Sequence, residues 1–117
     1  MKEHLPIKTA LLSYGMSGEV FHAPLIEGDP HFCIETVFQR NASKPVKHSY
    51  SVTSHLQEIL DNPEIELVIV NTPNENHYDD TKRVLLAEKH AVVEKPFTVT
   101  TKEADDLITL AVDKGKM

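Results

Sequence analysis

The feature that most restricts the fold of this chain is a short apolar run, LVIVNTP, at residues 67–73. The run is rich in β-branched side chains and ends abruptly at Asn71, Thr72 and the turn-forming Pro73. Such a run is typical of a strand buried on both faces, as in a parallel sheet covered by helices. Open sheets of this type bind ligands outside the carboxyl ends of their strands. The sequence therefore predicts a ligand-binding crevice beside Asn71.

Strand-like and helix-like segments alternate along the rest of the chain. We expect strands at residues 7–13, 32–40 and 91–94 around the one at 67–71, and a short strand at 51–52. Such alternation implies an α/β fold with a mostly parallel sheet, right-handed crossovers and helices on both faces, in three α/β/α layers. The predicted fold is Rossmann-like and doubly wound, without the last strand of the complete fold. If its strands follow the doubly wound order 3-2-1-4-5, those at 7–13 and 67–71 are neighbours and the switch point lies between them.

Helix boundaries follow from capping residues. Ser54 with Gln57, and Thr100 with Glu103, match the capping box, in which the first side chain accepts a bond from a free backbone N–H. Gly115 suits the left-handed residue that ends a helix. The helix expected after Pro73 reaches about Lys89, and its buried side is expected to consist of Tyr78, Val84, Leu85 and Leu86. In the last helix the expected buried side consists of Ala104, Leu107, Ile108 and Ala111.

Composition excludes several functions. At 117 residues the chain suits one domain, and a net charge of −6 argues against a nucleic-acid or membrane-surface binder. Cys33 is the one cysteine, so an internal disulfide and a cysteine-based metal site are excluded, and we expect Cys33 to fill the core. No metal site is expected. Without a leader-like or membrane-spanning stretch, the expected setting is the cytoplasm.

The first expected strand runs into a glycine-containing turn. In the dinucleotide-binding fingerprint, three glycines allow a tight turn, close approach of the pyrophosphate and close helix packing, and the helix N-terminus holds the phosphates. Those positions are Ser13, Gly15 and Gly18 here, so serine replaces the first glycine. A turn without a ligand has the same pattern, and the loop alone does not decide between them. The expected cofactor-binding residues of the loop are Ser13, Tyr14, Gly15, Met16, Ser17 and Gly18.

The end of the second expected strand indicates which cofactor is bound. A carboxylate there binds the ribose 2′-hydroxyl of NAD, whereas a basic residue accommodates the 2′-phosphate of NADP. Residues 38–44 contain no Asp or Glu and two cations. Arg40 can form paired hydrogen bonds with a phosphate, and Asn41 and Ser43 can add others. We therefore expect NADP rather than NAD, bound by Gln39, Arg40 and Asn41; a solvated Arg40 without a ligand is the alternative.

Three motifs resemble one known family. The segments YGMSGEVFHAP at 14–24, VNTPNENH at 70–77 and VEKP at 93–96 are similar to the N-terminal domain of the glucose–fructose oxidoreductase/inositol dehydrogenase (Gfo/Idh/MocA) family. The resemblance extends over essentially the whole chain. Its FHAP segment is similar to the branch that contains NADP-dependent scyllo-inositol dehydrogenases. The family has glycine where this chain has Ser13.

This resemblance implies an oxidoreductase that transfers hydride between NADP and a sugar, cyclitol or similar polyol. The lysine of the EKP motif lies near the nicotinamide and the substrate in the family, so Lys95 is the expected catalytic residue, with a role in proton relay. Pro96 would orient Lys95 by fixing the backbone. The cofactor-lining residues that the resemblance implies here are Asn71, Thr72, Pro73, Asn74, His77, Glu94, Lys95 and Pro96.

Members of the family carry a second, larger domain that supplies most substrate contacts and much of the dimer interface. We therefore expect residues 1–117 to be the cofactor-binding domain of a longer enzyme, able to bind NADP without turnover. Its exposed sheet edge would invite self-association. Two other functions stay open: a non-catalytic module that senses cofactor, which Lys95 disfavours, and an interaction domain that has lost its ligand, which Ser13 favours.

Overall fold

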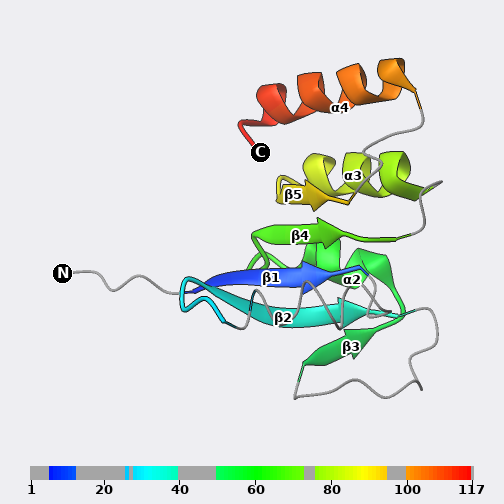
Figure 1. Ribbon diagram of the computed structural model, residues 1–117. Helices are drawn as coiled ribbons and strands as arrows, with labels where there is room; N and C mark the ends of the chain where they lie inside the picture. Colours follow the sequence, from blue (N-terminus) through cyan, green and yellow to red (C-terminus); the bar gives the residue numbers. More distant parts are fainter. Residues whose placement is uncertain are drawn as a thin grey trace.

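The computed structural model describes residues 6–12, 26, 28–39, 50–72, 76–94 and 100–116 (Figure 1). Its strands are β1 (Ile7–Leu11), β2 (Phe32–Phe38), β3 (Ser51–Thr53), β4 (Leu67–Val70) and β5 (His90–Val93). Its helices are α2 (Leu56–Asp61), α3 (His77–Leu86) and α4 (Thr101–Lys114). Every strand expected from the sequence is present, with ends that differ by one or two residues. The sequence also predicts that Pro24 stops or kinks the helix after the glycine-containing turn, and this position lies outside the described residues.

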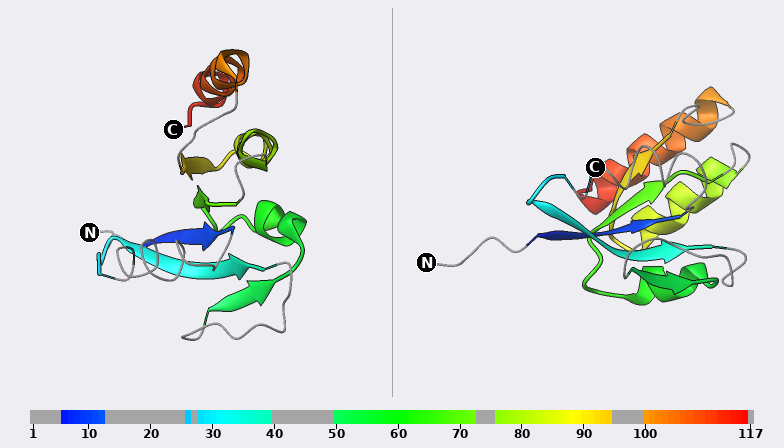
Figure 2. Two further views of the ribbon diagram at one scale, coloured as in Figure 1. Left: turned by 45° about the vertical axis from the view of Figure 1, so that its right-hand side comes forward. Right: turned by 60° about the horizontal axis from the view of Figure 1, so that its bottom comes forward.

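The strands form one sheet in the order β3-β2-β1-β4-β5, and all neighbours are parallel. The chain therefore crosses back over β1 between β3 and β4, and α2 lies in this crossover. Helix α3 connects β4 to β5 on the same side of the sheet as α2 (Figure 2). This is the predicted doubly wound, Rossmann-like order. Its switch point, where ligands bind in such folds, lies between β1 and β4.

Both faces of the central strands carry apolar clusters, because successive side chains of a strand point to opposite faces. The cluster under α2 and α3 consists of Ala10, Leu12, Ile59, Leu60, Ile65, Val68, Val70 and Val84. The cluster on the other face consists of Leu11, Ile34, Val37 and Ile69, with Ile26 packed against it. Burying one such aliphatic side chain stabilises the fold by about 1.5–3 kcal/mol. The continuous apolar run of β4 is thus explained by burial on both faces.

The expected cap of α4 is present at both ends. Thr100 Oγ1 accepts a hydrogen bond from the backbone N–H of Glu103 at 3.1 Å, as in a capping box. Gly115 has a φ of 66°, the left-handed conformation expected of a residue that ends a helix. None of the helices α2, α3 and α4 is long and apolar enough to cross a membrane.

The expected capping box at Ser54 is wrong. Helix α2 begins at Leu56 with His55 as its N-cap, and no side-chain cap bond is present there in the described part of the chain. Thr53 Oγ1 instead accepts from the His55 N–H at 3.0 Å and donates to Glu58 Oε2 at 2.7 Å. Thr53, the last residue of β3, therefore links the strand to α2, and the helix begins without the predicted cap.

Helix burial was predicted correctly at Val84, Leu85 and Leu107. It was wrong at Leu86 and Ile108, whose exposures are 51% and 55%. Each of these two residues follows a buried leucine and so points about 100° away from the buried side of its helix.

Two further expectations fail. Helix α3 ends at Leu86 rather than near Lys89. Cys33 is half-buried at the start of β2 rather than fully inside the core.

Candidate functional site

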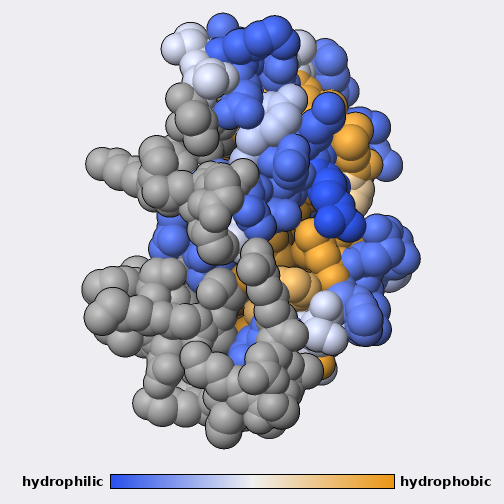
Figure 3. Space-filling view, turned by 90° about the vertical axis from the view of Figure 1, so that its right-hand side faces the viewer, coloured by the Kyte–Doolittle hydropathy of each residue, from blue (hydrophilic) through white to orange (hydrophobic). Residues whose placement is uncertain are grey.

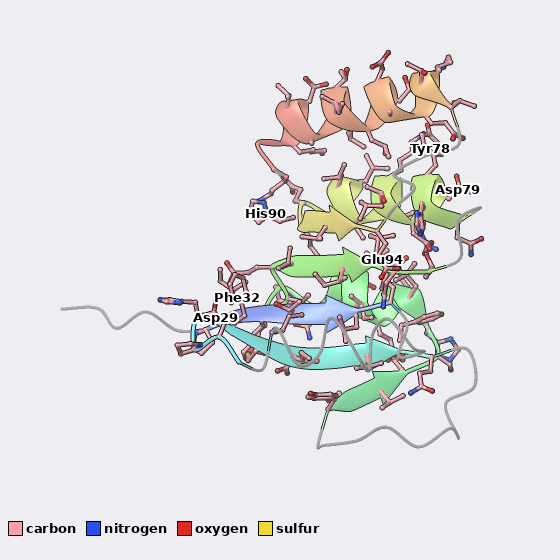
Figure 4. All side chains as sticks on the ribbon, in the orientation of Figure 1. Asp29, Phe32, Tyr78, Asp79, His90 and Glu94 are labelled. Atoms are coloured by element: carbon pink, nitrogen blue, oxygen red, sulfur yellow. The ribbon has the colours of Figure 1, made fainter. Side chains whose placement is uncertain are left out.

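The carboxyl ends of the central strands meet along one edge of the sheet. Just after β1, the Leu12 N–H donates to the Ile69 carbonyl of β4 at 3.2 Å. Just after β5, the Glu94 N–H donates to the Val70 carbonyl at 3.1 Å. Figure 4 shows Glu94 at this end of the sheet and His90, the first residue of β5, at the opposite end. The strand ends of β1, β4 and β5 therefore lie side by side.

The same edge continues across β2 and β3. The Gln39 N–H, just after β2, donates to the carbonyl of Thr53 at the end of β3 at 2.9 Å. The strand order places Gln39, which follows β2, and Glu94, which follows β5, on opposite sides of β1. Figure 3 looks onto this end of the sheet and shows, among the described residues, an apolar area with hydrophilic residues above it and to its right. An elongated ligand can therefore contact several strand ends at once.

Two amide side chains at this edge are almost fully buried: Gln39 is 7% exposed and Asn71 is 6% exposed. Within the described residues, the Nε2 of Gln39 finds no hydrogen-bond acceptor. Buried amide donors are nearly always hydrogen-bonded, because leaving one without a partner costs about 1–3 kcal/mol. The Gln39 amide is therefore suited to donate to an oxygen of a ligand at the end of β2.

The segment after β4 is tied to the first turn of α3. The Thr72 hydroxyl donates to Asp80 Oδ2 at 2.8 Å, and the Nε2 of His77 lies 2.7 Å from the Thr72 carbonyl oxygen. The His77 residue is only 1% exposed. Both the side chain and the backbone of Thr72 are thus held by α3.

Of the predicted site residues, the structure describes Gln39, Asn71, Thr72, His77 and Glu94, and it brings all five to the carboxyl edge of the sheet or to the helix turn beside it. Their individual roles remain predictions. The other predicted site residues lie outside the described residues; they are Ser13, Tyr14, Gly15, Met16, Ser17, Gly18, Arg40, Asn41, Pro73, Asn74, Lys95 and Pro96.

Sequence reasoning missed Asp80. Its carboxylate bonds to Thr72, eight residues earlier in the chain, and no local pattern reveals this contact. One signal was available: Asp80 lies three residues after His77, and residues with this spacing share one face of a helix.

Other polar features of the structure lie away from this edge. A shallow pocket beside Lys89, His90 and Lys116 lies at the starting end of β5, opposite Glu94. Lys89 Nζ is already bonded there to two backbone carbonyls. Among the described residues, no group of three or more histidine, cysteine or carboxylate side chains could hold a metal ion.

The fold and the polar strand ends at its switch point define a dinucleotide-binding domain of the Rossmann type. The model of one family, Gfo/Idh/MocA, described as an oxidoreductase family with an NAD-binding Rossmann fold, matches residues 7–117. The chain belongs to this family, as its EKP, NTPNENH and YGMSG motifs indicate.

Several relatives share this domain. Scyllo-inositol 2-dehydrogenase (NADP(+)) IolW of Bacillus subtilis is 40% identical over 112 residues, which cover 93% of this chain and 31% of the relative. The uncharacterized oxidoreductase YdgJ of Escherichia coli is 37% identical over 114 residues, or 95% and 33% of the two chains. A crystal structure of an oxidoreductase-class protein from Bacteroides fragilis matches with a TM-score of 0.89 and 46% identity over 96% of this chain and 35% of its own. The chain thus spans about a third of the length of these relatives.

Proposed function

We propose that this chain binds NADP(H) across the carboxyl ends of its strands, over the switch point between β1 and β4. The observation that carries the proposal is the row of polar residues at this edge: Gln39 after β2, Asn71 and Thr72 after β4, and Glu94 after β5. In doubly wound folds the adenosine ribose lies at the end of the second strand, where Gln39 offers a buried donor. The nicotinamide, when bound, supplies or accepts a hydride.

The preference for NADP over NAD rests on the residues after β2. Arg40 and Asn41 occupy the place where an NAD-binding domain carries a carboxylate, and a guanidinium can form two parallel hydrogen bonds with a phosphate. The relative IolW is a scyllo-inositol 2-dehydrogenase (NADP(+)), which supports the same preference.

We further propose that the chain is the cofactor domain of a longer oxidoreductase acting on a sugar, cyclitol or similar polyol in the cytoplasm. Lys95 of the EKP motif is its proposed catalytic residue, which holds the reacting oxygen and relays its proton. Pro96 is proposed to orient Lys95. Because the relatives are about three times as long, residues 1–117 are proposed to bind cofactor without turning over substrate.

The test is a titration of the chain with NADPH and with NADH, by fluorescence or calorimetry, repeated on Arg40→Asp. We expect the wild type to bind NADPH more tightly. In Arg40→Asp, NADPH binding should weaken about tenfold or more, as for the loss of a charged hydrogen bond, while NADH binding is retained or improved. Lys82→Asp is the control, because it makes the same charge change on the exposed surface of α3.

Different outcomes separate the alternatives. A folded chain that binds neither cofactor would contradict the proposal and favour an interaction domain without a ligand. Equal effects of Arg40→Asp and Lys82→Asp would contradict the role of Arg40. Cofactor binding without turnover by a full-length relative carrying the same EKP motif would favour a sensor module over an enzyme.

We also propose that the chain can associate with a second copy through β5. In the described part of the chain β5 has one neighbour, β4, so its other edge presents backbone N–H and C=O groups. Exposed edges of this kind pair with other strands.

A further inference from the structure

The end of β4 is held from two directions by the first turn of α3. The Thr72 hydroxyl donates to Asp80 Oδ2 at 2.8 Å, and His77 Nε2 contacts the Thr72 carbonyl oxygen at 2.7 Å. One bond fixes the side chain of Thr72 and the other fixes its peptide plane. Thr72 directly follows Asn71, whose side chain is buried at the proposed cofactor site.

The chemistry of the two bonds determines their direction. A carbonyl oxygen can only accept, so His77 Nε2 carries the proton and donates to Thr72. A hydroxyl that donates to a carboxylate forms a charge-assisted bond, stronger than a bond between neutral groups. His77 and Asp80 are three residues apart on a helix, so one rigid turn carries both anchors.

We infer that Asp80 is a positioning residue for the dinucleotide: together with His77 it fixes the orientation in which Asn71 and Thr72 meet the cofactor. The inference rests on the proposed cofactor function and deepens it, because neither the motif nor the strand pattern includes Asp80. Holding a binding segment in its bound conformation lowers the ordering cost of association.

The helix provides a matched control. Asp79 and Asp80 both lie in the first turn of α3, where a carboxylate interacts favourably with the helix dipole. Asp79 is exposed, whereas Asp80 is half-buried against Thr72. Substituting alanine at either position removes one negative charge from the same helix end. Only the substitution at Asp80 removes the bond to Thr72.

The first measurement is the NADPH dissociation constant of Asp80→Ala, Asp80→Asn and Asp79→Ala, at a temperature well below the melting point of each variant. We expect Asp80→Ala to raise the dissociation constant about tenfold and Asp79→Ala to leave it within about twofold. Asp80→Asn keeps an oxygen that accepts from Thr72, so it should restore most of the affinity. A purely structural role would lower the melting temperature without changing the affinity of the folded protein.

Thr72→Val and Thr72→Ser provide a second pair should Asp80→Ala fail to fold. Thr72→Val removes the hydroxyl at nearly constant shape and should weaken NADPH binding as Asp80→Ala does, and Thr72→Ser, which keeps the hydroxyl, should restore most of the affinity that Thr72→Val loses. A double-mutant cycle between Thr72→Val and Asp80→Ala, measured by denaturant unfolding without cofactor, should show coupling of about tenfold in the unfolding equilibrium constant.

These measurements distinguish the two proposals. Equal dissociation constants for Asp80→Ala and Asp79→Ala, or for Thr72→Val and wild type, would overturn the positioning role while leaving cofactor binding intact. A folded wild type that binds neither NADPH nor NADH would overturn the proposed function and with it the role of Asp80. The cycle would still report whether the Thr72–Asp80 bond stabilises the fold.

Discussion

Lys89 is a charged residue that this fold buries. It is 4% exposed, and its Nζ donates to the carbonyl oxygens of Asn62 at 2.7 Å and Ile65 at 2.6 Å. These carbonyls belong to the turn that leads from α2 into β4, so Lys89 joins that turn to the start of β5. A lysine after a helix is normally solvated, and no pattern in the sequence marks this one as different.

Replacing Lys89 with methionine should destabilise the fold. Methionine fills a similar volume but removes the lysine donor from both carbonyls, and within the described residues only the Asn62 carbonyl keeps another bond, from the Ile65 N–H at 3.2 Å. We therefore expect the free energy of unfolding to fall by about 2 kcal/mol. Chemical denaturation measures this change. Lys82→Met, at an exposed position of α3, should change stability by less than about 0.5 kcal/mol. Equal stability of the two variants would contradict the anchoring role of Lys89.

The stability of the protein should also depend on pH through Lys89. Burial lowers the pKa of its ammonium group below the ordinary value of 10.5. In the interval just below 10.5 the unfolded chain therefore binds more protons than the folded one, and the free energy of unfolding rises with pH. The stability difference between wild type and Lys89→Met should grow from about pH 7 to about pH 10. A difference that shrinks over this interval would mean that the two carbonyls raise the pKa instead.

At the scale of single residues, the sequence predicted positions better than contacts. Asn71 and Thr72 were expected at a ligand site because they end a buried strand, and both lie at that edge. The partners that hold Thr72 were not predicted, because the bond between Thr72 and Asp80 joins the end of a strand to a helix residue eight positions later. Burial of Lys89 was missed because its two bonds join residues that are 27 and 24 positions apart in the sequence.

Helices α3 and α4 end in the same hydrogen-bond motif. After α3, Glu88 N–H donates to Leu85 and Lys89 N–H donates to Val84; after α4, Gly115 N–H donates to Val112 and Lys116 N–H donates to Ala111. This is the Schellman arrangement, which places one residue in the left-handed conformation. That residue is Gly115 in one helix, with φ 66°, and Glu88 in the other, with φ 62°.

Opposite substitutions at these two positions should have opposite effects. A side chain in the left-handed region costs about 1–2 kcal/mol, partly offset because glycine loses more entropy on folding. Glu88→Gly should therefore raise the free energy of unfolding by about 0.5–1 kcal/mol, and Gly115→Ala should lower it by about 1 kcal/mol. Apart from the adjoining backbone, no atom of the described residues lies within 4 Å of the position that a Cβ would take at Gly115, so a steric clash would not affect the result. Denaturant unfolding measures both; loss of stability in Glu88→Gly would show that the glutamate side chain has a stabilising role.

At the scale of elements, prediction succeeded where one local motif acts alone. The Thr100 cap and the Gly115 terminus need only their own helix, and both are as expected. The Ser54 box failed because Thr53, at the end of β3, bonds the His55 N–H and the Glu58 carboxylate, and α2 begins with His55 rather than Ser54 as its N-cap. The hydrogen bonds of Thr53, the last residue of β3, therefore influence where α2 begins.

The strand order of the whole molecule was predictable because few topologies satisfy short, right-handed parallel connections. The alternation of elements predicted a parallel sheet, and the parallel direction of the strands brings Gln39, Asn71 and Glu94 to one edge. The order 3-2-1-4-5, the doubly wound one, places these residues around the switch point between β1 and β4. The remaining site residues could be assigned from motifs only, because loops between strands and helices carry no periodic pattern.

The two edges of the sheet differ in length. Strand β3 has 3 residues and β5 has 4, and the exposed middle of β5 is Val92, 47% accessible. Natural proteins protect such edges with short strands or with charged side chains, particularly lysine. Neither edge strand carries a lysine, but β5 is one residue longer and its Val92 is more exposed than Val52 of β3, at 47% against 36%. Strand β5 is therefore the better candidate for pairing with a second copy.

The whole chain should therefore associate as its concentration rises, and Val92→Lys should suppress this association. The lysine places a charge in the middle of the β5 edge, while Val92 contributes little to the core because it is exposed. Val52→Lys is the matched control: Val52 is 36% exposed in β3, at the opposite edge. Sedimentation velocity, or size-exclusion chromatography with light scattering, should show a mass that increases with concentration for the wild type and for Val52→Lys, and a monomer for Val92→Lys. A monomeric wild type at high concentration would show that β5 is protected in solution, and equal association of the two variants would place the contact elsewhere.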